Sequence, residues 1–311
     1  MCAARISCVA CLRYFLRDVR KMELKQTYLH VKKTLASAAI DSADLEARMI
    51  LTHVTGVSVA DLILNPDRAV QDDHMQTING IVARRVQHEP LSKILGEKEF
   101  WGLPFTVSAD VLDPRPDTET IIEAAIRRFR DNPPQRILDL GTGSGCLIIS
   151  LLHEFPDAHG VAVDISVDAL GIAKTNADKN GVLDRCTFHE SDWIESLSAG
   201  DADSDTEKYD LIVSNPPYIP NQDIENLSAE VQNHDPILAL DGGNDGLNAY
   251  KKIIPALNSQ MHADGIALLE VGISQAEDVV RIVKDTGLSV RGVHADLGGI
   301  PRVVEISFGE K

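Results

Sequence analysis

The chain has 311 residues, 44% of them hydrophobic and 25% charged, which is typical of a globular protein long enough for two domains. No apolar run reaches the roughly 18–20 residues that are needed to cross a bilayer, so we expect no membrane contact. The formal net charge of -17 disfavours nucleic-acid partners without excluding them, because binding a phosphate backbone requires clustered Lys and Arg side chains.

The first 21 residues contain five basic residues and one acid, which fits a transit-type leader. The alternative, which we favour, is that the chain starts at Met22, where an amphipathic helical pattern begins. Cys8 and Cys11 have the spacing of a metal or redox pair, but no second pair follows, so we predict no metal site. The odd number of five cysteines, with no secretory signal, predicts a reducing, cytoplasmic location.

Residues 22–89 are predicted to form a small helical domain of about four helices. Apolar residues recur there at spacings of three and four, and turn-forming pairs separate the runs. In residues 90–114, Gly96, Gly102 and Pro104 stand between short apolar runs, which indicates a hairpin-like connector.

Residues 115–311 alternate between strands and helices after a helix that is capped by Asp117 or Thr118. This alternation predicts an α/β fold: a doubly wound, mostly parallel sheet of seven strands with right-handed crossovers and a terminal antiparallel hairpin. The acidic segment 198–208 is predicted to be a mobile surface insertion. The five expected parallel strands are 136–140, 160–164, 186–191, 209–214 and 266–271.

The segment "ILDLGTGSG" predicts a cofactor loop, because a strand runs through three glycines directly into a helix. A nicotinamide dinucleotide fingerprint requires a small residue where Cys146 stands, which argues against that cofactor. The pattern D-x-G-x-G-x-G instead resembles that of class I S-adenosylmethionine methyltransferases, whereas a glycine-rich turn without a ligand is the structural alternative. The predicted cofactor-binding residues of this loop are Asp139, Gly141, Thr142, Gly143 and Gly145.

Two acids stand at the ends of the next strands. Asp164 ends the second strand, where a carboxylate can accept hydrogen bonds from both ribose hydroxyls. Asp192 ends the third strand beside Trp193, and in class I methyltransferases a polar residue at this place meets the adenine amine. Helix capping is the alternative for Asp192. We predict that Asp164, Asp192, Trp193 and Asn215 also bind the cofactor.

The segment "SNPPYIP" follows the fourth strand, which we expect beside the first. Methylating a planar nitrogen requires acceptors for both of its N–H hydrogens, because its lone pair is delocalised. The Asn215 side-chain oxygen and the Pro216 carbonyl can be these acceptors, since proline has no N–H and a fixed φ. Tyr218 can pack on the planar group. We predict Asn215, Pro216 and Tyr218 as catalytic and Pro217 as a further substrate contact; a simple turn is the alternative.

From Met22 to Phe308 the chain resembles the release-factor glutamine methyltransferases (PrmC/HemK type). The resemblance rests on "GEKEFWG", "RPDTE", "DLGTGSG", "VAVDIS", "SNPPYIP", "DGGNDGL" and "HADLGGIPR", in that order. It implies methyl transfer from S-adenosyl-L-methionine, with S-adenosyl-L-homocysteine as product and no metal. The acceptor would be the side-chain amide nitrogen (N5) of the glutamine in the Gly-Gly-Gln motif of class I peptide chain release factors.

The resemblance also implies that the helical domain helps to dock the release factor, that nucleic acid is not bound directly, and that the protein is a monomer. Phe100 and Trp101 match the family's aromatic connector near the substrate, although packing between the two domains explains them equally well. Arg115, Thr118 and Glu119 are expected either at the wall of the cofactor pocket or in local caps and ion pairs.

Three further residues, His294, Asp296 and Arg302, lie in the closing hairpin, and we expect them to stabilise a turn. Two other functions stay open at this point. The first is an amino-methyltransferase that acts on a nucleic-acid base, and the second is a catalytically silent cofactor-binding adaptor.

Overall fold

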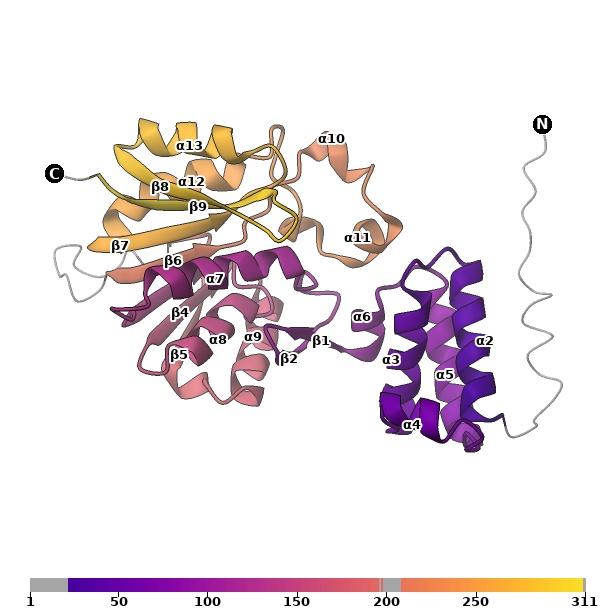
Figure 1. Ribbon diagram of the computed structural model, residues 1–311. Helices are drawn as coiled ribbons and strands as arrows, with labels where there is room; N and C mark the ends of the chain where they lie inside the picture. The colour runs from indigo at the N-terminus through magenta and orange to yellow at the C-terminus, as the bar shows by residue number, and fades with distance from the viewer. Residues whose placement is uncertain (1–21, 196, 198–207, 310–311) are drawn as a thin grey trace, which may run out of the picture. The chain divides into compact units, whose positions relative to one another are not determined.

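The computed structural model describes residues 22–195, 197 and 208–309. The chain divides into two compact units, the first ending at Leu95 and the second beginning at Gly96 (Figure 1). The predicted leader, Cys8 with Cys11, and nearly all of the predicted insertion at 198–208 lie outside the described residues. Within the described residues, no helix has the length and apolar character that crossing a membrane requires. The same part of the chain holds no cluster of three or more potential metal ligands.

The first unit is helical, as predicted. Its core is formed by apolar side chains that recur along the longer helices, with Leu35, Ile50 and Ile78 fully buried. Arg85 and Glu46 form an ion pair with two hydrogen bonds, which joins two of these helices (Nε–Oε2 2.6 Å, Nη2–Oε1 3.1 Å). The described helices of this unit are α2 (Leu24–Ser37), α3 (Ala43–Thr55), α4 (Val59–Leu64), α5 (Asp72–Arg85) and α6 (Leu91–Leu95).

The segment that we predicted as a connector divides between the two units. Residues 91–95 form helix α6 of the first unit, because Pro90 suits the start of a helix and its carbonyl accepts from the Ile94 N–H at 3.0 Å. The expected hairpin forms after it, from β1 (Glu97–Phe100) and β2 (Leu103–Thr106), and belongs to the second unit. Trp101 and Gly102 make its two-residue turn with positive φ values of 51° and 70°.

The second unit contains a seven-stranded sheet in the order β5-β4-β3-β6-β7-β9-β8. Strands β5 to β7 pair in parallel, and the last two strands form an antiparallel hairpin, so the predicted sheet is confirmed. The order of the strands reverses at β3 and β6, and ligands bind at such a point beyond the carboxyl ends of the strands. The strands are β3 (Arg136–Leu140), β4 (His159–Asp164), β5 (Cys186–Glu190), β6 (Tyr209–Ser214), β7 (Met261–Glu270), β8 (Leu288–Ala295) and β9 (Pro301–Phe308).

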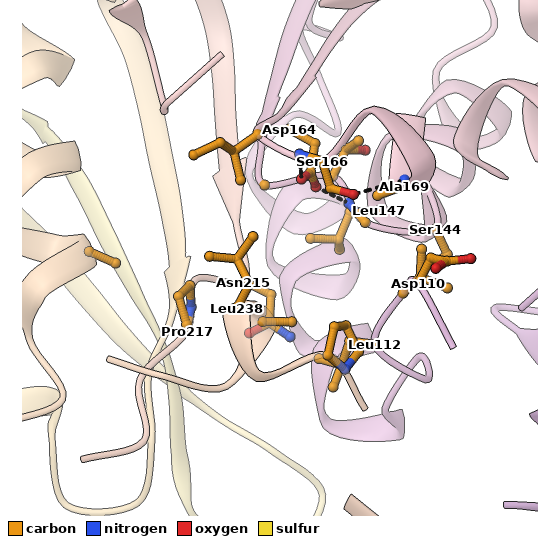
Figure 2. Close-up of a pocket in the computed structure, with 18 of the residues that line it drawn as sticks. Asp110, Leu112, Ser144, Leu147, Asp164, Ser166, Ala169, Asn215, Pro217 and Leu238 are labelled. Carbon is orange, nitrogen blue, oxygen red and sulfur yellow. Dashed lines mark hydrogen bonds between the residues drawn. The ribbon is translucent and has the colours of Figure 1, made fainter. Parts of the chain in front are cut away.

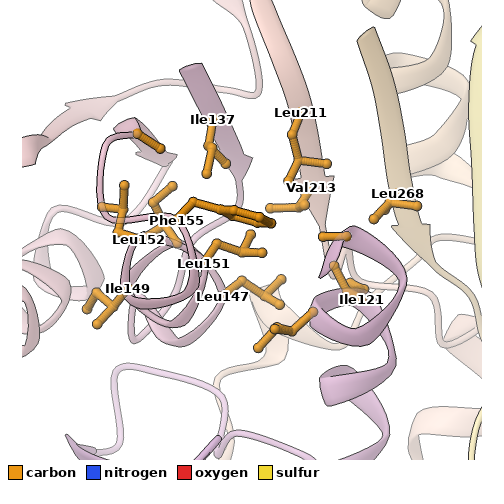
Figure 3. Close-up of a cluster of buried hydrophobic side chains, with 14 of the residues drawn as sticks. Ile121, Ile137, Leu147, Ile149, Leu151, Leu152, Phe155, Leu211, Val213 and Leu268 are labelled. Atoms are coloured by element: carbon orange, nitrogen blue, oxygen red, sulfur yellow. The ribbon is translucent and has the colours of Figure 1, made fainter. Parts of the chain in front are cut away.

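Helices cover both faces of this sheet because successive strand residues point to opposite sides. Ile137 of β3 packs in the cluster formed with α7 (Glu119–Arg128), α8 (Cys146–Glu154) and α9 (Val167–Lys179), which Figure 3 shows. The next residue, Leu138, packs in the opposite cluster with α12 (Asn248–Gln260) and α13 (Ala276–Asp285). Both clusters are almost completely buried, so the ends of the strands are held rigidly.

The structure differs from the sequence-based expectation at several boundaries. Strand β7 starts at Met261 rather than at Ile266. The sequence does not indicate this start, because His262, Asp264 and Gly265 interrupt the apolar run. Three short helices were not predicted, since elements of three to six residues contain too few periods to be recognised. They are α10 (Asn221–Ile224), α11 (Ala229–His234) and η5 (Ile237–Ala239), and they follow the N-P-P-Y segment.

A buried asparagine ties the hairpin to the start of α8. The Asn176 side chain, which is not exposed at all, accepts from the Thr106 N–H at 2.7 Å and donates to the Thr106 carbonyl at 3.0 Å. It also donates to the Ser144 carbonyl at 2.8 Å. One side chain therefore satisfies three backbone groups and holds the glycine loop against β2.

We expect Asn176→Ala to lower the free energy of unfolding of the second unit by about 2–4 kcal/mol, because it leaves buried backbone groups without partners. Both tryptophans of the chain, Trp101 and Trp193, lie in this unit, so urea denaturation followed by their fluorescence measures the loss. The matched control is Thr175→Ala on the exposed side of α9, which we expect to change stability by less than about 0.5 kcal/mol. Equal stability of the two variants would contradict this assignment.

Candidate active site

A cavity of about 400 Å³ lies beyond the carboxyl ends of β3, β4 and β6, as expected for the point where the strand order reverses (Figure 2). Its volume is within the range of small-molecule sites. Residues from seven segments line it, including the glycine loop, the end of β4 and the segment after β6. The predicted residues in its wall are Gly141, Thr142, Gly143, Asp164, Asp192, Trp193, Asn215 and Pro217. Arg115 and Thr118, which we expected either here or in local caps and ion pairs, line it as well, whereas Glu119 does not.

The glycine loop has the backbone geometry that the sequence predicts. Gly141, Gly143 and Gly145 all have positive φ, at 72°, 54° and 80°. A Cβ on Gly145 would lie 2.9 Å from Cδ1 of Ile149 and 3.2 Å from Cβ of Ala173, so this glycine packs the loop onto α8 and α9. Among the described residues other than its two chain neighbours, none has an atom within 4 Å of the Cβ position of Gly143, which leaves room for a ligand against the backbone.

Asp139 lies beneath the loop and does not line the cavity. Its Oδ2 accepts a hydrogen bond from the Thr142 hydroxyl at 2.7 Å, and it is only 1% exposed. Burial raises the pKa of this carboxyl to about 7. In the described part of the chain its Oδ1 has no hydrogen-bond partner. Asp139 therefore stabilises the loop through Thr142 and does not contact the cavity directly.

Asp164 presents an oriented carboxylate to the cavity (Figure 2). Its Oδ2 accepts from the Gly143 N–H at 2.8 Å and its Oδ1 from the Ser166 N–H at 2.9 Å. Burial raises the pKa of Asp164, while these two N–H groups oppose that shift. Each oxygen keeps a further lone pair, so the pair can accept hydrogen bonds from two neighbouring hydroxyls, as in a ribose.

The Asp192 carboxylate is engaged by a residue that sequence reasoning did not consider. Its Oδ2 lies 2.7 Å from Nζ of Lys252, which also lines the cavity. Trp193 has a positive φ of 57°, which is uncommon for a bulky residue, and its indole lies 3.5 Å from the Cβ position of Gly141. These residues close the side of the cavity that faces α12.

A second cavity, of about 290 Å³, adjoins the first. The two cavities share four residues in their walls: Leu112, Arg115, Asn215 and Ala239. Pro216 and Tyr218 line only the second, as do Asp117, Glu270 and Arg302. The N-P-P-Y segment therefore separates two adjoining spaces, with Asn215 at the boundary.

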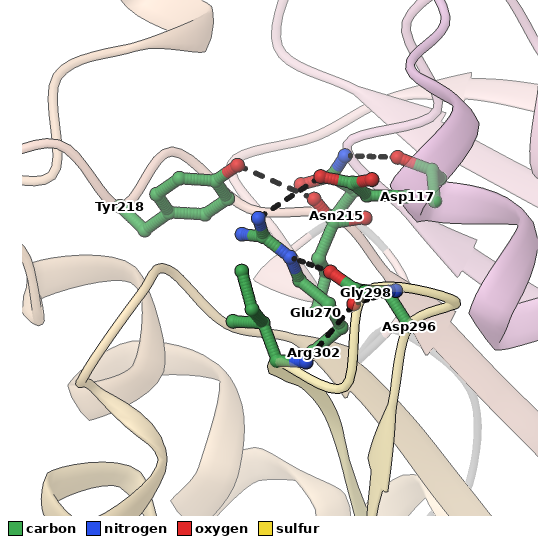
Figure 4. Close-up of polar contacts among 9 residues, drawn as sticks. Asp117, Asn215, Tyr218, Glu270, Asp296, Gly298 and Arg302 are labelled. Atoms are coloured by element: carbon green, nitrogen blue, oxygen red, sulfur yellow. Dashed lines mark hydrogen bonds and ion pairs between the residues drawn. The ribbon is translucent and has the colours of Figure 1, made fainter.

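The polar contacts around this boundary are drawn in Figure 4. Asn215 Nδ2 donates to Thr118 Oγ1 at 3.0 Å. The Tyr218 hydroxyl donates to Oε1 of Glu270 at 3.3 Å, and burial raises the pKa of Tyr218 well above its usual range. Glu270, at the end of β7, is 1% exposed, and burial raises its pKa to about 7. Its Oε2 has no hydrogen-bond partner in the described part of the chain.

Asp296 stabilises the turn between β8 and β9, where it accepts from the N–H groups of Gly298 at 2.8 Å and Ile300 at 3.0 Å. It also accepts from Nε of Arg302 at 2.9 Å. Arg302 reaches further, because its Nη2 lies 2.9 Å from Oδ2 of Asp117 in the wall of the second cavity (Figure 4). The turn that the sequence indicated thus also fixes a cation beside Glu270.

The segment "DGGNDGL" packs against the backbone of Tyr218. A Cβ on Gly242 would lie 2.8 Å from the Tyr218 carbonyl carbon, and one on Gly246 would overlap the Tyr218 carbonyl oxygen. Gln275 Nε2 donates to that same oxygen at 2.9 Å. The glycines are required here because only bare backbone fits against the N-P-P-Y segment.

Phe100 and Trp101 line neither cavity. The Phe100 ring is 2% exposed and packs edge-on against Phe105 in the core. The Trp101 backbone N–H donates to Glu119 at 3.0 Å and its indole Nε1 to Glu154 at 2.7 Å. The structure therefore does not bring these two residues together with Asn215.

Sequence reasoning missed Glu270. The signal was present, because an acid closes the apolar strand "IALLE" at the same edge of the sheet as Asp139 and Asp164.

Two family models match the chain. Residues 26–96 match the PrmC N-terminal domain, and residues 114–234 match the methyltransferase small domain. Several curated relatives are named release factor glutamine methyltransferase. The one from Bradyrhizobium diazoefficiens is 41% identical over 90% of this chain and 94% of its own length. The one from Geobacter sulfurreducens is 40% identical over 87% of this chain and 91% of its own.

Solved structures share the fold at low identity. The catalytic domain of hMettl16, solved in complex with a MAT2A 3'UTR hairpin, is 16% identical with a TM-score of 0.54, covering 84% of this chain and 92% of that one. A methyltransferase from Pyrococcus furiosus is 15% identical with a TM-score of 0.50, covering 77% of this chain and all of the other.

The reversed strand order, the glycine loop and the matching domain model define an S-adenosylmethionine-dependent methyltransferase. The cavity fits that cofactor, since it combines bare backbone at Gly143 with the paired acceptor oxygens of Asp164. Over most of its length the chain matches the curated relatives, and it belongs to the release factor glutamine methyltransferase family.

We expect Asp164→Asn to raise the dissociation constant for S-adenosylmethionine by about 10–100-fold, because an amide must turn an N–H toward Gly143 or Ser166 and loses a charged acceptor. Isothermal titration calorimetry measures the change. Asp168→Asn, an exposed position on α9 outside the cavity wall, is the matched control and should bind like the parent protein. An unchanged constant in Asp164→Asn would remove Asp164 from the cofactor site.

Proposed function

We propose that this protein transfers a methyl group from S-adenosyl-L-methionine to the side-chain amide nitrogen (N5) of the glutamine in the Gly-Gly-Gln motif of class I peptide chain release factors. The observation that carries the proposal is the position of Asn215 between two adjoining cavities. One cavity has a cofactor loop and the other is lined by Pro216 and Tyr218. The names of the curated relatives support the choice of substrate.

The chemistry requires the acceptor nitrogen to be held rather than activated by a strong base. A carboxamide nitrogen is a poor nucleophile because its lone pair is delocalised, and it becomes acidic once it is alkylated. When bound, S-adenosylmethionine supplies an electrophilic methyl group. In the proposed reaction, Asn215 Oδ1 and the Pro216 carbonyl accept the two N–H hydrogens and thereby aim the lone pair at the first cavity.

The two prolines suit this task. Pro216 and Pro217 have no N–H and a fixed φ, so their backbone is stiff and donates no hydrogen bond of its own. Gly242 and Gly246 pack directly against the Tyr218 backbone, so the segment cannot move in that direction. The Tyr218 side chain lines the second cavity and can lie against the planar amide. Together these residues give the preorganised geometry that electrostatic catalysis needs.

A protein substrate fits the charge of the chain better than a nucleic acid. The formal net charge is -17, which disfavours a polyanionic partner. We therefore do not favour the nucleic-acid base as methyl acceptor. Docking through the helical unit, a monomeric state and a cytoplasmic location stay predictions.

Incubation of the protein with S-adenosylmethionine and a class I release factor should add one methyl group to the Gly-Gly-Gln peptide. Mass spectrometry of the tryptic peptide measures this, and a release factor with Glu in place of that glutamine is the control that should gain nothing. A parallel reaction contains naked ribosomal RNA and DNA with labelled cofactor. Label in nucleic acid and none in the release factor would overturn the proposed function.

We expect Asn215→Ala to lower kcat by at least about 100-fold, because the acceptor nitrogen loses one of the two groups that hold it. Cofactor affinity should change by less than about fivefold, since the glycine loop and Asp164 are intact. Steady-state kinetics with the release factor, combined with calorimetry, separates the two effects. Asn226→Ala, at an exposed residue outside both cavities, is the control. Wild-type turnover by Asn215→Ala would exclude the mechanism.

A further inference from the structure

The wall of the first cavity is acidic. Its described residues include four acids and two bases, which are Asp110, Asp164, Asp192, Asp241, Arg115 and Lys252. S-adenosylmethionine carries a sulfonium, an ammonium group and one carboxylate. The acidic wall attracts the two positive groups, but it repels the carboxylate unless a cation lies close to it. The cavity therefore needs one cation that is placed for this carboxylate.

The backbone of the glycine loop is largely engaged within the chain, although such loops often bind anions through their N–H groups. Four of the five N–H groups in residues 141–145 donate to other groups of the chain: Gly141 and Thr142 to the Val163 carbonyl at 2.9 Å, Gly143 to Asp164 Oδ2 at 2.8 Å, and Gly145 to the Thr142 carbonyl at 2.8 Å. Because these donors already have partners, the carboxylate needs a side-chain cation.

Lys252 is engaged at another side of the cavity. Its Nζ lies 2.7 Å from Oδ2 of Asp192. With Trp193, these residues close the side that faces α12, where we expect the adenine. The charge of Asp192 offsets that of Lys252, so this side offers no net positive charge to a carboxylate.

Arg115 lies where the first cavity adjoins the second. It lines both cavities, as does Leu112, which lies at the end of the first cavity away from Asp164 (Figure 2). Pro116 favours extended backbone in the residue before it, and Arg115 has φ -100° and ψ 141°. Its Nη2 donates to Oδ2 of Asp235 at 2.7 Å, and the Asp235 side chain is only 1% exposed. The guanidinium is therefore held by a buried acid.

The guanidinium of Arg115 keeps further donors for a ligand. The side chain is 41% exposed, and within the described residues the Nη2 donation to Asp235 is its one hydrogen bond. A guanidinium presents pairs of parallel N–H groups, which match the two oxygens of a carboxylate. Arg115 can therefore bind a second carboxylate while Asp235 holds its orientation.

The place of Arg115 fits the methionyl arm of the cofactor. A sulfonium joins three groups: the methyl group, the adenosyl group and this arm. With the methyl group toward Asn215 and the ribose at Asp164, the arm starts beside Asn215 and carries its carboxylate only a few single bonds farther on. Arg115 shares both cavity walls with Asn215, so it is the cation at this end of the cavity.

We propose that Arg115 binds the carboxylate of the methionyl arm of S-adenosylmethionine. The inference rests on the proposed function for the direction of the bound cofactor, and it adds the partner of the carboxylate. It also links a further segment to the cofactor site, because Asp235 directly follows the short helix α11 and holds the Arg115 side chain.

The test compares S-adenosylmethionine with decarboxylated S-adenosylmethionine, which keeps the sulfonium and the ammonium group but lacks the carboxylate. Isothermal titration calorimetry without a release factor gives both dissociation constants. The wild-type protein should bind S-adenosylmethionine about 10–100-fold more tightly, as expected for a hydrogen-bonded pair of charged groups. Equal affinity of the wild-type protein for the two ligands would overturn the proposal without any variant.

Arg115→Met keeps an unbranched aliphatic side chain and removes the guanidinium. The dissociation constant for S-adenosylmethionine should rise about 10–100-fold, and that for the decarboxylated ligand should change less than about threefold. The preference for the carboxylate should thus disappear. An equal loss for both ligands would show a structural role alone and would overturn the proposal.

Arg115→Met leaves the Asp235 carboxylate buried without its cation, which can destabilise the fold. Circular dichroism checks the variant, and the double variant with Asp235→Asn removes the unpaired charge. The double variant should show the same loss of preference between the two ligands. A preference as large as that of the wild-type protein would contradict the assignment of Arg115.

Lys252→Met is the matched control, because it removes the other cation of the cavity wall. It should affect both ligands to the same extent and keep the preference for S-adenosylmethionine. Loss of the preference in Lys252→Met, with retention in Arg115→Met, would assign the carboxylate to Lys252 and overturn the proposal.

Steady-state kinetics distinguish a contact with the protein substrate. If Arg115→Met bound both cofactor ligands like the wild-type protein and raised only the KM for the release factor, Arg115 would belong to the substrate site and the proposal would fail. The calorimetric result does not depend on the methyl acceptor, because no release factor is present. A failure of the proposed substrate would therefore leave the carboxylate preference unchanged.

Discussion

The parallel pairing of β3 with β6 is the constraint on which the site depends. Asp139 pairs with Val213, so the glycine loop and Asn215 leave the sheet side by side. The two strands lie far apart in the sequence, and the crossover that joins them includes β4 and β5. Because both strands are buried on both faces, their ends cannot shift independently. The cofactor cavity and the second cavity therefore adjoin at Asn215.

Three buried or half-buried carboxyl groups end strands at this edge, and each has a different partner. Asp139 holds the glycine loop through Thr142, Asp164 is oriented by two backbone N–H groups, and Glu270 accepts from the Tyr218 hydroxyl. Burial raises the pKa of all three, and the hydrogen bonds oppose that shift. Asp164 thus lines the first cavity and Glu270 the second, where a bound cationic methyl donor and substrate N–H groups would meet them, whereas Asp139 lies beneath the glycine loop.

Much of this arrangement was predictable from the sequence, because it is encoded locally. Glycine permits positive φ angles and proline fixes its own φ, so the glycine loop and the N-P-P-Y segment were recognisable, and the strand–helix alternation predicted the sheet. The helices α10 and α11 were missed because each is too short to show a period. Phe100 was expected near the substrate, but the hairpin β1–β2 turns its ring into the core.

The sequence by itself determined the sheet and the glycine loop, and it predicted Asn215 as the group that meets the methyl acceptor. Tertiary structure alone decided how Asn215 is held. Its amide donates to Thr118, a residue 97 positions away, while Tyr218 of the same segment donates to Glu270 at the end of β7. A sequence pattern indicates the periodicity of apolar residues and the backbone angles that single residues allow. The direction of a hydrogen bond between distant side chains depends on how the short 3-10 helix η1 (Pro116–Thr118) packs against the ends of β6 and β7. Only the folded chain fixes this packing.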